Sequence, residues 1–501
     1  MKRLLYNAFL MLLPLAAGAQ ERAVSDRAFV ENIVSRALWM GTDNAAGLAV
    51  QPVHEFNTLD FSYGIEDGSH ALYQEGTHTG DFCFDTRGAL AVGRMQLWGQ
   101  FSYDNITVKD SRFNTVLFDP FDEREVFYVA DPNPSGFRRQ VYNMQFKAAM
   151  PLTRGMFAGL HVKYTDRIGA KQVDPRSESY KYSLDVRPSL VYVSGSNTFG
   201  ISSFYSNMFE RTVPTLSNAS EIQDVYVLRG LGNYVSDIVG SGGLSTLFYR
   251  SNTYGGAVQY GRDGKLLVEL KASHSSTHGS ESATQPYKLG STAMLDAGFG
   301  LQYLLPSGKI SAQASYRSTD ATEYSQIHNL STGEYEVKAS SVTANYSGIS
   351  ASAAYEHYLG ASDSAPYVWK FAGSVAWDAK DDIYYLPETV FSYSNLSVLL
   401  NASRRFSFAS SVLRAGLSGG YKLAVGSNYE YAGIHAADPP ASDWYPHDIE
   451  ILGASCARAG VSADWAKAVK AGTSVNVNAS AEYLFSDKGR LFASVGLGLV
   501  F

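Results

Sequence analysis

Alternation of apolar and polar residues from about residue 55 to the last residue constrains this chain more than any other feature. Leu295, Phe299 and Leu301 share one face of a predicted strand, and Asp296 and Gln302 share the other. Because successive side chains of a strand point to opposite faces, this period of two predicts strands with one apolar and one polar face. The same design recurs over the segments 142–165, 265–272, 309–317 and 413–423.

Short turns alternate with long polar segments along this pattern. Asp263-Gly264 is a short turn, whereas residues 110–139, 210–243 and 426–448 read as long outer loops. A soluble sandwich also alternates, but this asymmetry is typical of a membrane barrel with short periplasmic turns. A closed barrel also satisfies every backbone N–H and C=O in lipid. The sequence therefore predicts an all-β fold, a transmembrane antiparallel β-barrel over residues 51–501 with about 16 to 18 strands, an even number being usual.

The chain opens with a predicted secretory signal peptide, residues 1–19. Lys2 and Arg3 precede an apolar run that ends at Leu15, and small residues occupy the cleavage positions before Gln20. The run is shorter than the roughly 20 residues that a spanning helix needs. A signal peptide for export and a membrane barrel together predict that the protein is located in the outer membrane of a Gram-negative bacterium.

The composition agrees with a membrane barrel. Aromatic residues make up 13% of the chain and charged residues 18%, against about 25% charged in soluble domains. Outer-membrane lipids are therefore expected partners, whereas a net charge of -7 without a basic block gives no support for nucleic-acid binding. Cys83 and Cys456 lie far apart in sequence. A disulfide is conceivable if the barrel ends meet, but two unpaired strand residues are the favoured interpretation.

Residues 20–50 follow a helical rather than an alternating pattern. Apolar residues at helical spacing predict a helix from about Asp26 to Met40, with Ser25 as N-cap and Gly41 as C-cap. A helix before the first strand either plugs the lumen or lies beneath it in the periplasm, and the sequence leaves both open.

The final segment carries an apolar face that ends on the terminal residue: Val495, Leu497, Leu499 and Phe501. It resembles the C-terminal strand of bacterial outer-membrane barrels, and the whole chain is similar to uncharacterised families of such barrels. The resemblance implies that these four residues are a membrane-assembly signal and that the barrel-assembly machinery is a partner during biogenesis. Asn44 to Leu48 more weakly resembles the start of fatty-acid-transporter-type barrels, although Ala45 replaces their Pro.

The polar strand faces carry more bases than acids. The predicted lumen-facing charges are Lys147, Lys163, Lys265, Lys271, Lys309, Arg317, Arg414 and Lys422, against Glu269, Asp296 and Glu482. A basic wall around water favours anions. A salt-bridged filler network is the equally weighted alternative.

Motifs for chemistry are weak. His274 and His278 flank three hydroxyl residues, but no orienting third group is apparent, so no catalytic site is expected. The spacing of His435 and His447 matches no metal-ligand motif, and no cofactor is expected. The aromatic and acidic residues of 426–448 suit a glycan or calcium site, although a solvated loop is favoured.

The leading function is a structural or passive-transport barrel with a polar lumen, without enzymatic activity. A transporter for hydrophobic compounds is the first alternative, and an apolar pocket between the N-terminal segment and the wall would mark it. An outer-membrane hydrolase is the second, and a Ser-His-acid or Asp-His set at the outer rim would mark it.

Overall fold

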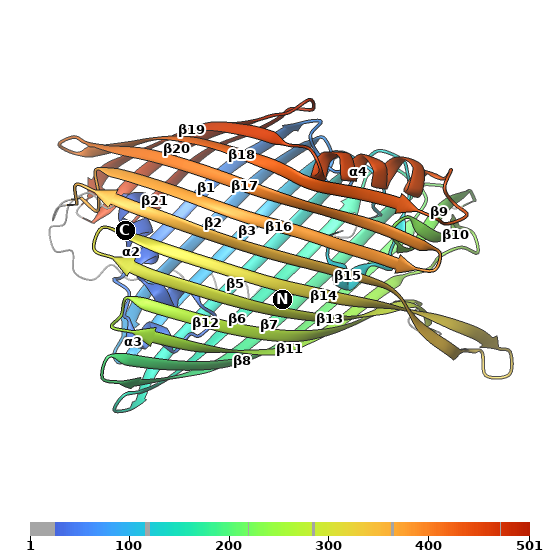
Figure 1. The fold of residues 1–501 in the computed structure, drawn as a ribbon, viewed down its shortest axis with the longest axis horizontal. Helices are drawn as coiled ribbons and strands as arrows, with labels where there is room; N and C mark the ends of the chain where they lie inside the picture. The colour runs from blue at the N-terminus through green and yellow to red at the C-terminus, as the bar shows by residue number, and fades with distance from the viewer. Residues whose placement is uncertain (1–25, 116–120, 219, 283–285, 362–364, 471) are drawn as a thin grey trace.

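The computed structural model describes residues 26–115, 121–218, 220–282, 286–361, 365–470 and 472–501. The predicted signal peptide and Ser25 lie outside the described residues. The alternating segments form one closed antiparallel sheet of 18 strands (Figure 1). This confirms the predicted barrel and its strand number.

The first seven strands of the wall are β1 (Phe56–Gly68), β2 (His78–Val92), β3 (Met95–Ser111), β5 (Ser135–Thr153), β6 (Met156–Lys171), β7 (Arg176–Ser194) and β8 (Asn197–Thr215). The rest of the wall is made by β11 (Leu247–Arg262), β12 (Leu266–Glu281), β13 (Tyr287–Leu305), β14 (Gly308–Asn329), β15 (Glu334–Leu359), β16 (Trp369–Tyr385), β17 (Glu388–Ser407), β18 (Ser411–Tyr431), β19 (Cys456–Lys470), β20 (Thr473–Phe485) and β21 (Arg490–Val500). Outside the wall, β4 (Val129–Ala130), β9 (Ile222–Gly230) and β10 (Asn233–Gly240) form a separate small sheet.

The first and last strands close the barrel. β1 pairs with β21 as well as with β2, and Phe61 lies opposite Leu497 in this seam. β2 and β19 are separated by β1, β21 and β20, so Cys83 and Cys456 are not on neighbouring strands. Both cysteines are free thiols, as the favoured interpretation expected.

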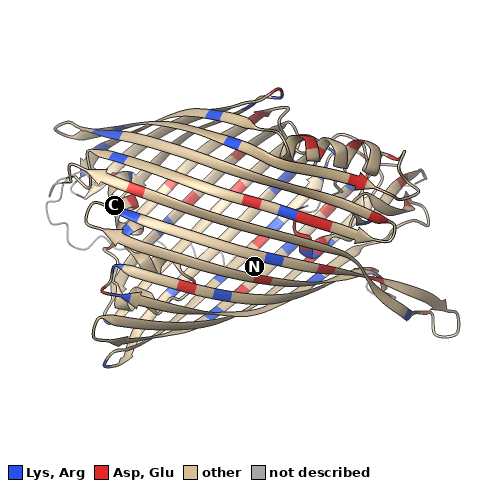
Figure 2. Ribbon diagram, viewed as in Figure 1, with Lys and Arg blue, Asp and Glu red and all other residues tan. Residues whose placement is uncertain are grey.

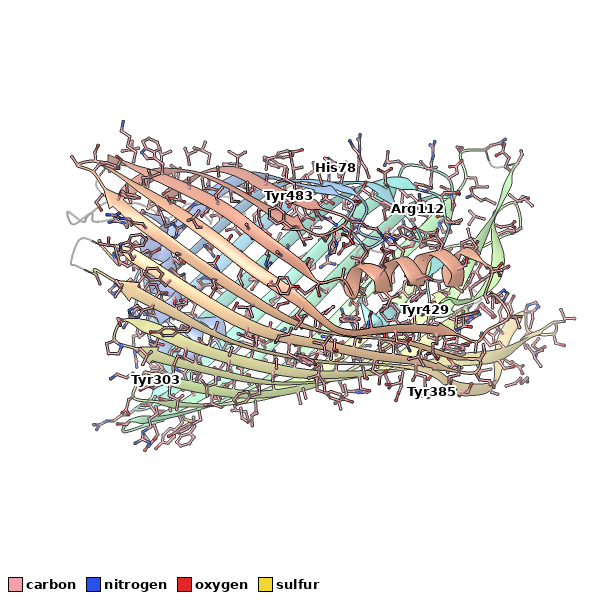
Figure 3. The ribbon with its side chains drawn as sticks, turned by 45° about the horizontal axis from the view of Figure 1, so that its top comes forward. His78, Arg112, Tyr303, Tyr385, Tyr429 and Tyr483 are labelled. Atoms are coloured by element: carbon pink, nitrogen blue, oxygen red, sulfur yellow. The ribbon has the colours of Figure 1, made fainter. Side chains whose placement is uncertain are left out.

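The apolar strand faces form the outer wall. Leu270, Leu400 and Leu417 are 54%, 62% and 67% exposed, because their side chains point away from the barrel. Charged positions occur along the middle of the strands as well as at the ends (Figure 2). Tyr303 lies toward one end of the outer wall and Tyr385 toward the other (Figure 3). Tyrosines at both ends of an apolar band are typical of a membrane barrel.

The two ends of the barrel differ. The turns after β2, β5, β7, β11 and β13 are short, and the C-terminus lies at this end together with the N-terminal helices (Figure 1). The opposite end carries the small sheet and the helices η2 (Glu123–Glu125), η3 (Pro440–Trp444) and α4 (Tyr445–Leu452). We call these the short-turn end and the long-loop end.

The N-terminal segment contains three short helices: α2 (Arg27–Arg36), η1 (Leu38–Gly41) and α3 (Gly47–Val50). The predicted helix from Asp26 to Met40 is therefore too long. Asp26 is the N-cap, since its carboxylate accepts from the Phe29 amide at 3.0 Å. Ala37 leaves the helical region with ψ 82° and ends α2. No helix within the described ranges is long and apolar enough to cross a membrane.

Candidate functional site

The N-terminal segment lies inside the barrel at the short-turn end, and ion pairs join α2 to the wall. Asp26 accepts from Arg405 of β17 at 2.7 Å. Glu31 pairs with Arg414 of β18 at 2.5 Å and with Lys370 of β16. We refer to residues 26–50 as the plug.

The second half of the plug contacts the opposite side of the wall. Asp43 pairs with Arg187 of β7 and lies 3.4 Å from Lys163 of β6. Asn44, which is fully buried, donates to the Gln259 side chain of β11 at 2.9 Å. The plug therefore reaches from β16–β18 across the lumen to β6–β11.

Burial of apolar side chains adds to these polar contacts. Leu38 and Trp39 pack with Val191, Leu267 and Leu304 of the inner wall. At a second point, Val30 packs with Phe56, Ala89 and Val500 near the seam. Side chains of the plug and of the wall occupy the space between them at both points, so the plug is packed against the wall.

One glycine permits the closest approach of the plug backbone. A Cβ placed on Gly159 of β6 would lie 2.2 Å from the Ala46 nitrogen. Any side chain here would force the plug backbone away from the wall. Glycine is thus required at this point of contact.

Bases of the wall lower the pKa of two plug carboxylates, Glu31 and Asp43. Burial opposes the charge on Asp43, but Arg187 and Lys163 outweigh it and lower its pKa from the usual 3.8. Burial likewise opposes ionisation of Glu31, and Lys370 and Arg414 lower its pKa from 4.5. The electrostatic attraction therefore favours the docked plug at neutral pH.

Most of the charges predicted to face the lumen have partners in the plug, the wall or the outer loops. Contacts to the plug are made by Lys147, Lys163, Lys309 and Arg414. Wall or loop partners are Gln259 for Glu269, Asp296 for Arg317, Arg458 for Glu482, and the carbonyls of Ile451 and Leu452 for Lys422. Lys271 lines a lumen cavity, and Lys265 is exposed in the turn before β12. The pairing favours the salt-bridged network over a free basic wall.

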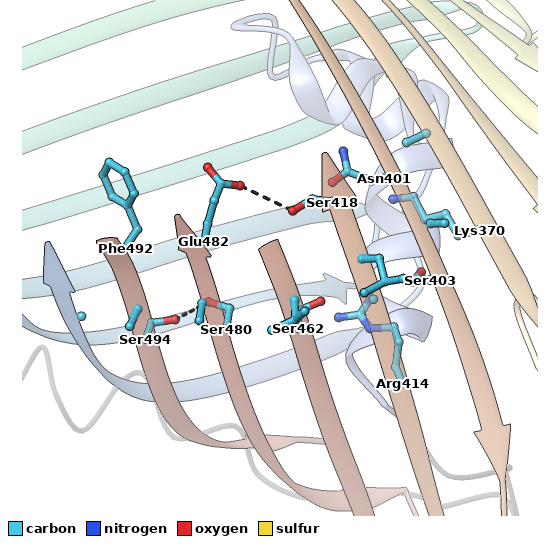
Figure 4. Close-up of a pocket in the computed structure, with 18 of the residues that line it drawn as sticks. Lys370, Asn401, Ser403, Arg414, Ser418, Ser462, Ser480, Glu482, Phe492 and Ser494 are labelled. Atoms are coloured by element: carbon cyan, nitrogen blue, oxygen red, sulfur yellow. Dashed lines mark hydrogen bonds between the residues drawn. The ribbon is translucent and has the colours of Figure 1, made fainter. Parts of the chain in front are cut away.

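A polar chamber of about 780 Å³ lies beside α2. A row of hydroxyl groups on adjacent strands lines it: Ser403, Ser418, Ser462, Ser480 and Ser494 (Figure 4). Ser418 donates to Glu482 at 3.5 Å, and Ser480 bonds Ser494 at 2.8 Å. This surface offers many hydroxyl donors and acceptors to a polar solute.

Two further cavities adjoin along the lumen. One, of about 480 Å³, begins at Gly41 and Thr42 of the plug. The other, of about 560 Å³, lies under the outer loops. Ser315 and Ser350 line both, so the two cavities meet at mid-barrel. The plug stands at the inner end of this path.

The outer loops fold over the long-loop end as a cap, which we define as residues 112–115, 121–134, 216–218, 220–246 and 432–455. Tyr429 donates to the Leu231 carbonyl at 3.3 Å, so the β9–β10 hairpin reaches β18 from the far side of the barrel. Trp444 is 3% exposed and belongs with Leu231 to one apolar cluster. The interpretation of residues 426–448 as a solvated loop is therefore wrong for Tyr429, Trp444 and Tyr445, because their rings pack in this cluster.

Charged contacts fix the cap to the lumen wall. Lys181 of β7 lies between Glu125 and Glu210, 2.8 Å and 3.2 Å away. Lys380 of β16 contacts Glu123 at 3.1 Å. Since η2 carries both Glu123 and Glu125, this helix bridges β16 and β7 across the barrel.

Sequence comparison identifies relatives of this chain. A family model described as a family of unknown function (DUF6850) matches residues 45–501. The chain belongs to this family. The match covers the barrel, and α2 precedes it. No protein matches in a comparison with curated proteins.

Structural comparison of this DUF6850 member finds other barrels. The ferric preacinetobactin receptor BauA of Acinetobacter baumannii has 10% identity and a TM-score of 0.37, with 89% of this chain and 80% of that chain covered. The Escherichia coli outer membrane transporter YddB has 8% identity and a TM-score of 0.40, with 89% and 81% covered. The monoaromatic hydrocarbon channel CymD has 10% identity and a TM-score of 0.31, with 94% and 93% covered. At these scores the likenesses add nothing to what the barrel itself shows, and the resemblance of residues 44–48 to fatty-acid-transporter-type barrels gains no support.

The histidine cluster of this DUF6850 member is divided between the two faces of β12. Ser275 and Thr277 face inward and bond Thr253 and Ser251 of β11. Ser276 and His278 lie 3.5 Å apart on the outer face. Among the described residues, no group of three or more His, Cys, Asp or Glu is arranged to hold a metal ion.

Sequence reasoning missed Asp26, Glu31 and Asp43 as plug contacts. The available signal was their charge, because three acids in the N-terminal segment complement a wall rich in bases. Their partners are more than a hundred residues away in sequence, so pairing required the closed barrel.

Proposed function

We propose that this protein is an outer-membrane barrel for passive transport of polar solutes, closed in this state by its N-terminal plug and without enzymatic activity. The observation that carries the proposal is the position of the plug. Its residues Gly41 and Thr42 bound the inner end of a polar lumen cavity, and this cavity adjoins the one under the outer loops. A barrel with a purely structural function does not require a path through its lumen that ends at the plug.

The fit of the plug also bears on the alternatives. A transporter for hydrophobic compounds needs an apolar pocket between plug and wall, whereas Leu38 and Trp39 fill that contact. A hydrolase needs a nucleophile, a base and an orienting group together. His274 and Ser275, neighbours in sequence, point to opposite faces of β12. Transport of polar solutes is therefore the better-supported function.

The biogenesis that we propose follows the sequence. The chain is exported by a cleaved signal peptide and inserted among outer-membrane lipids by the barrel-assembly machinery. Leu497 and Val495 are 52% and 53% exposed on the outer wall, which suits recognition of the last strand before it is embedded. We propose no nucleic-acid partner for this protein.

The test is single-channel conductance in a planar bilayer. The full chain should be closed for most of the recording, and deletion of residues 26–50 should give a steady ion current. Heat-modifiable migration on gels is the control that the shortened barrel is folded. A folded barrel that stays silent without its plug would contradict the proposal that the plug alone closes the path, and a full chain that is steadily open would contradict any closure by the plug.

A further inference from the structure

The cavity beneath the cap has the features of a ligand site. Its volume is about 560 Å³, which is within the usual range for small-molecule pockets. The wall contributes Tyr346, Asp382 and Phe391, and the cap contributes Tyr128 and Trp444. Residues far apart in sequence thus enclose one space between the cap and the lumen.

Two buried polar atoms at this cavity lack partners. Tyr346 is 5% exposed and Asp382 is 2% exposed. Among the described residues, neither the Tyr346 hydroxyl nor Oδ1 of Asp382 has a hydrogen-bond partner. The other oxygen of Asp382 lies 3.1 Å from Lys380. Leaving a buried polar group unpaired is costly, so these two atoms are available to pair with a hydroxyl group of a solute in the cavity.

Aromatic rings bound the same space. Phe391 and Tyr445 lie 5.7 Å apart between ring centroids, one from the wall and one from the cap. Phe391 also packs against Tyr393 at 6.3 Å. Ring faces and edges provide flat apolar surface. A sugar ring presents C–H groups to such a surface while its hydroxyls reach the polar atoms.

Several charges at the cavity are already compensated. Glu123 contacts Lys380 at 3.1 Å, and Arg317 contacts Asp296 at 3.0 Å. Asp448 accepts from the Trp444 indole at 2.9 Å, and burial raises its pKa to about 7. These pairings favour a neutral ligand over an ion, because an ion would have to compete with existing partners.

We propose that this cavity binds a neutral, polyhydroxylated solute of di- or trisaccharide size, with Tyr346 and Asp382 as its hydrogen-bonding residues. The inference rests on the proposed function in taking this solute to be the transported one. Ser315 and Ser350 at the floor connect the cavity to the next one toward the plug. A solute that leaves the cap site therefore meets further hydroxyl groups.

The test measures binding directly to the full chain in detergent, by calorimetry with maltotriose and cellotriose. Tyr346→Phe removes the hydroxyl and keeps the ring, so it should weaken binding by at least tenfold. Because that hydroxyl has no hydrogen-bond partner among the described residues, the thermal stability of Tyr346→Phe should not fall. Tyr385→Phe, at an exposed tyrosine on the outer wall, is the matched control and should bind normally.

Several results would overturn the proposal. No binding of either trisaccharide, or equal binding by Tyr346→Phe, would show that the cavity is not a saccharide site. Tighter binding of choline than of maltotriose would assign it to organic cations instead. Asp382→Asn is a second variant, expected to weaken binding as well. The conductance of the plug-deleted barrel is a separate measurement, so failure of the cavity proposal leaves the transport proposal intact.

Discussion

Asp43 of the plug and Arg187 of β7 form an ion pair that joins the N-terminal segment to the barrel wall. The two residues are 144 positions apart in sequence. Lys163 lies 3.4 Å from the same carboxylate, so one acid of the plug is shared by two bases of the wall. Glu31 repeats the arrangement on the far side with Lys370 and Arg414.

Neutralising both carboxylates should release the plug. In Glu31→Gln/Asp43→Asn we expect docking to weaken by about 2 kcal/mol, because charge-assisted hydrogen bonds are lost at sites that are about one-third exposed. The open fraction in planar bilayers should rise by about thirtyfold. Glu450→Gln is the matched control, since Glu450 pairs with Lys488 in the outer loops at 3.0 Å. An unchanged open fraction in the double variant would argue against electrostatic docking.

Acid should have the same effect on the unmodified protein. The pKa values of Asp43 and Glu31 are lowered from 3.8 and 4.5, so their contribution to docking is complete above those values. It is lost as the pH falls through the lowered pKa values, because protonation removes the charge. Recordings at pH 3 should therefore show more open channels than recordings at pH 7. The double variant should show little further change between these two pH values, and a full acid response in that variant would point to other groups.

The two faces of the strands should respond differently to charge. Arg at Leu301 faces lipid and should destabilise the barrel by about 2 to 4 kcal/mol if it lies near the bilayer midplane. Arg at Gln302, which lines a lumen cavity, should be tolerated. Denaturant unfolding in lipid vesicles measures both. Equal costs at the two positions would contradict the assignment of faces.

The last residue should matter for assembly. Phe501 exchanges backbone hydrogen bonds of 2.7 Å and 3.0 Å with Asn57, next to the seam. Deleting Phe501 should remove this pairing and the terminal aromatic ring, and should lower the amount of inserted barrel without blocking export. Cell fractionation and heat-modifiable migration measure the two steps. Normal outer-membrane levels of the deleted form would show that insertion does not depend on Phe501.

The strands of the barrel wall could be predicted from the sequence because they depend on a local pattern of neighbouring residues. Leu301 and Gln302 point to opposite faces in any strand, so the alternation of apolar and polar residues predicts the strands and, with the asymmetry of the turns, the barrel. The exposure of Leu270 and the position of Val495 follow from the same period. The prediction of about 16 to 18 strands also agrees with the 18 strands of the wall.

The contents of the lumen depended on contacts that no local pattern encodes. Lys163 and Arg414 read as bases on a polar face, but only barrel closure brings Asp43 and Glu31 of the plug to them. Tyr429 reads as part of a solvated loop, yet it meets Leu231 across the opening. A period of two determines which way a side chain points, whereas the group it meets across the lumen depends on closure of the barrel, which brings together segments more than a hundred residues apart. The sequence alone therefore determined a barrel with a polar interior, and the tertiary structure decided that the interior is plugged at one end and capped at the other.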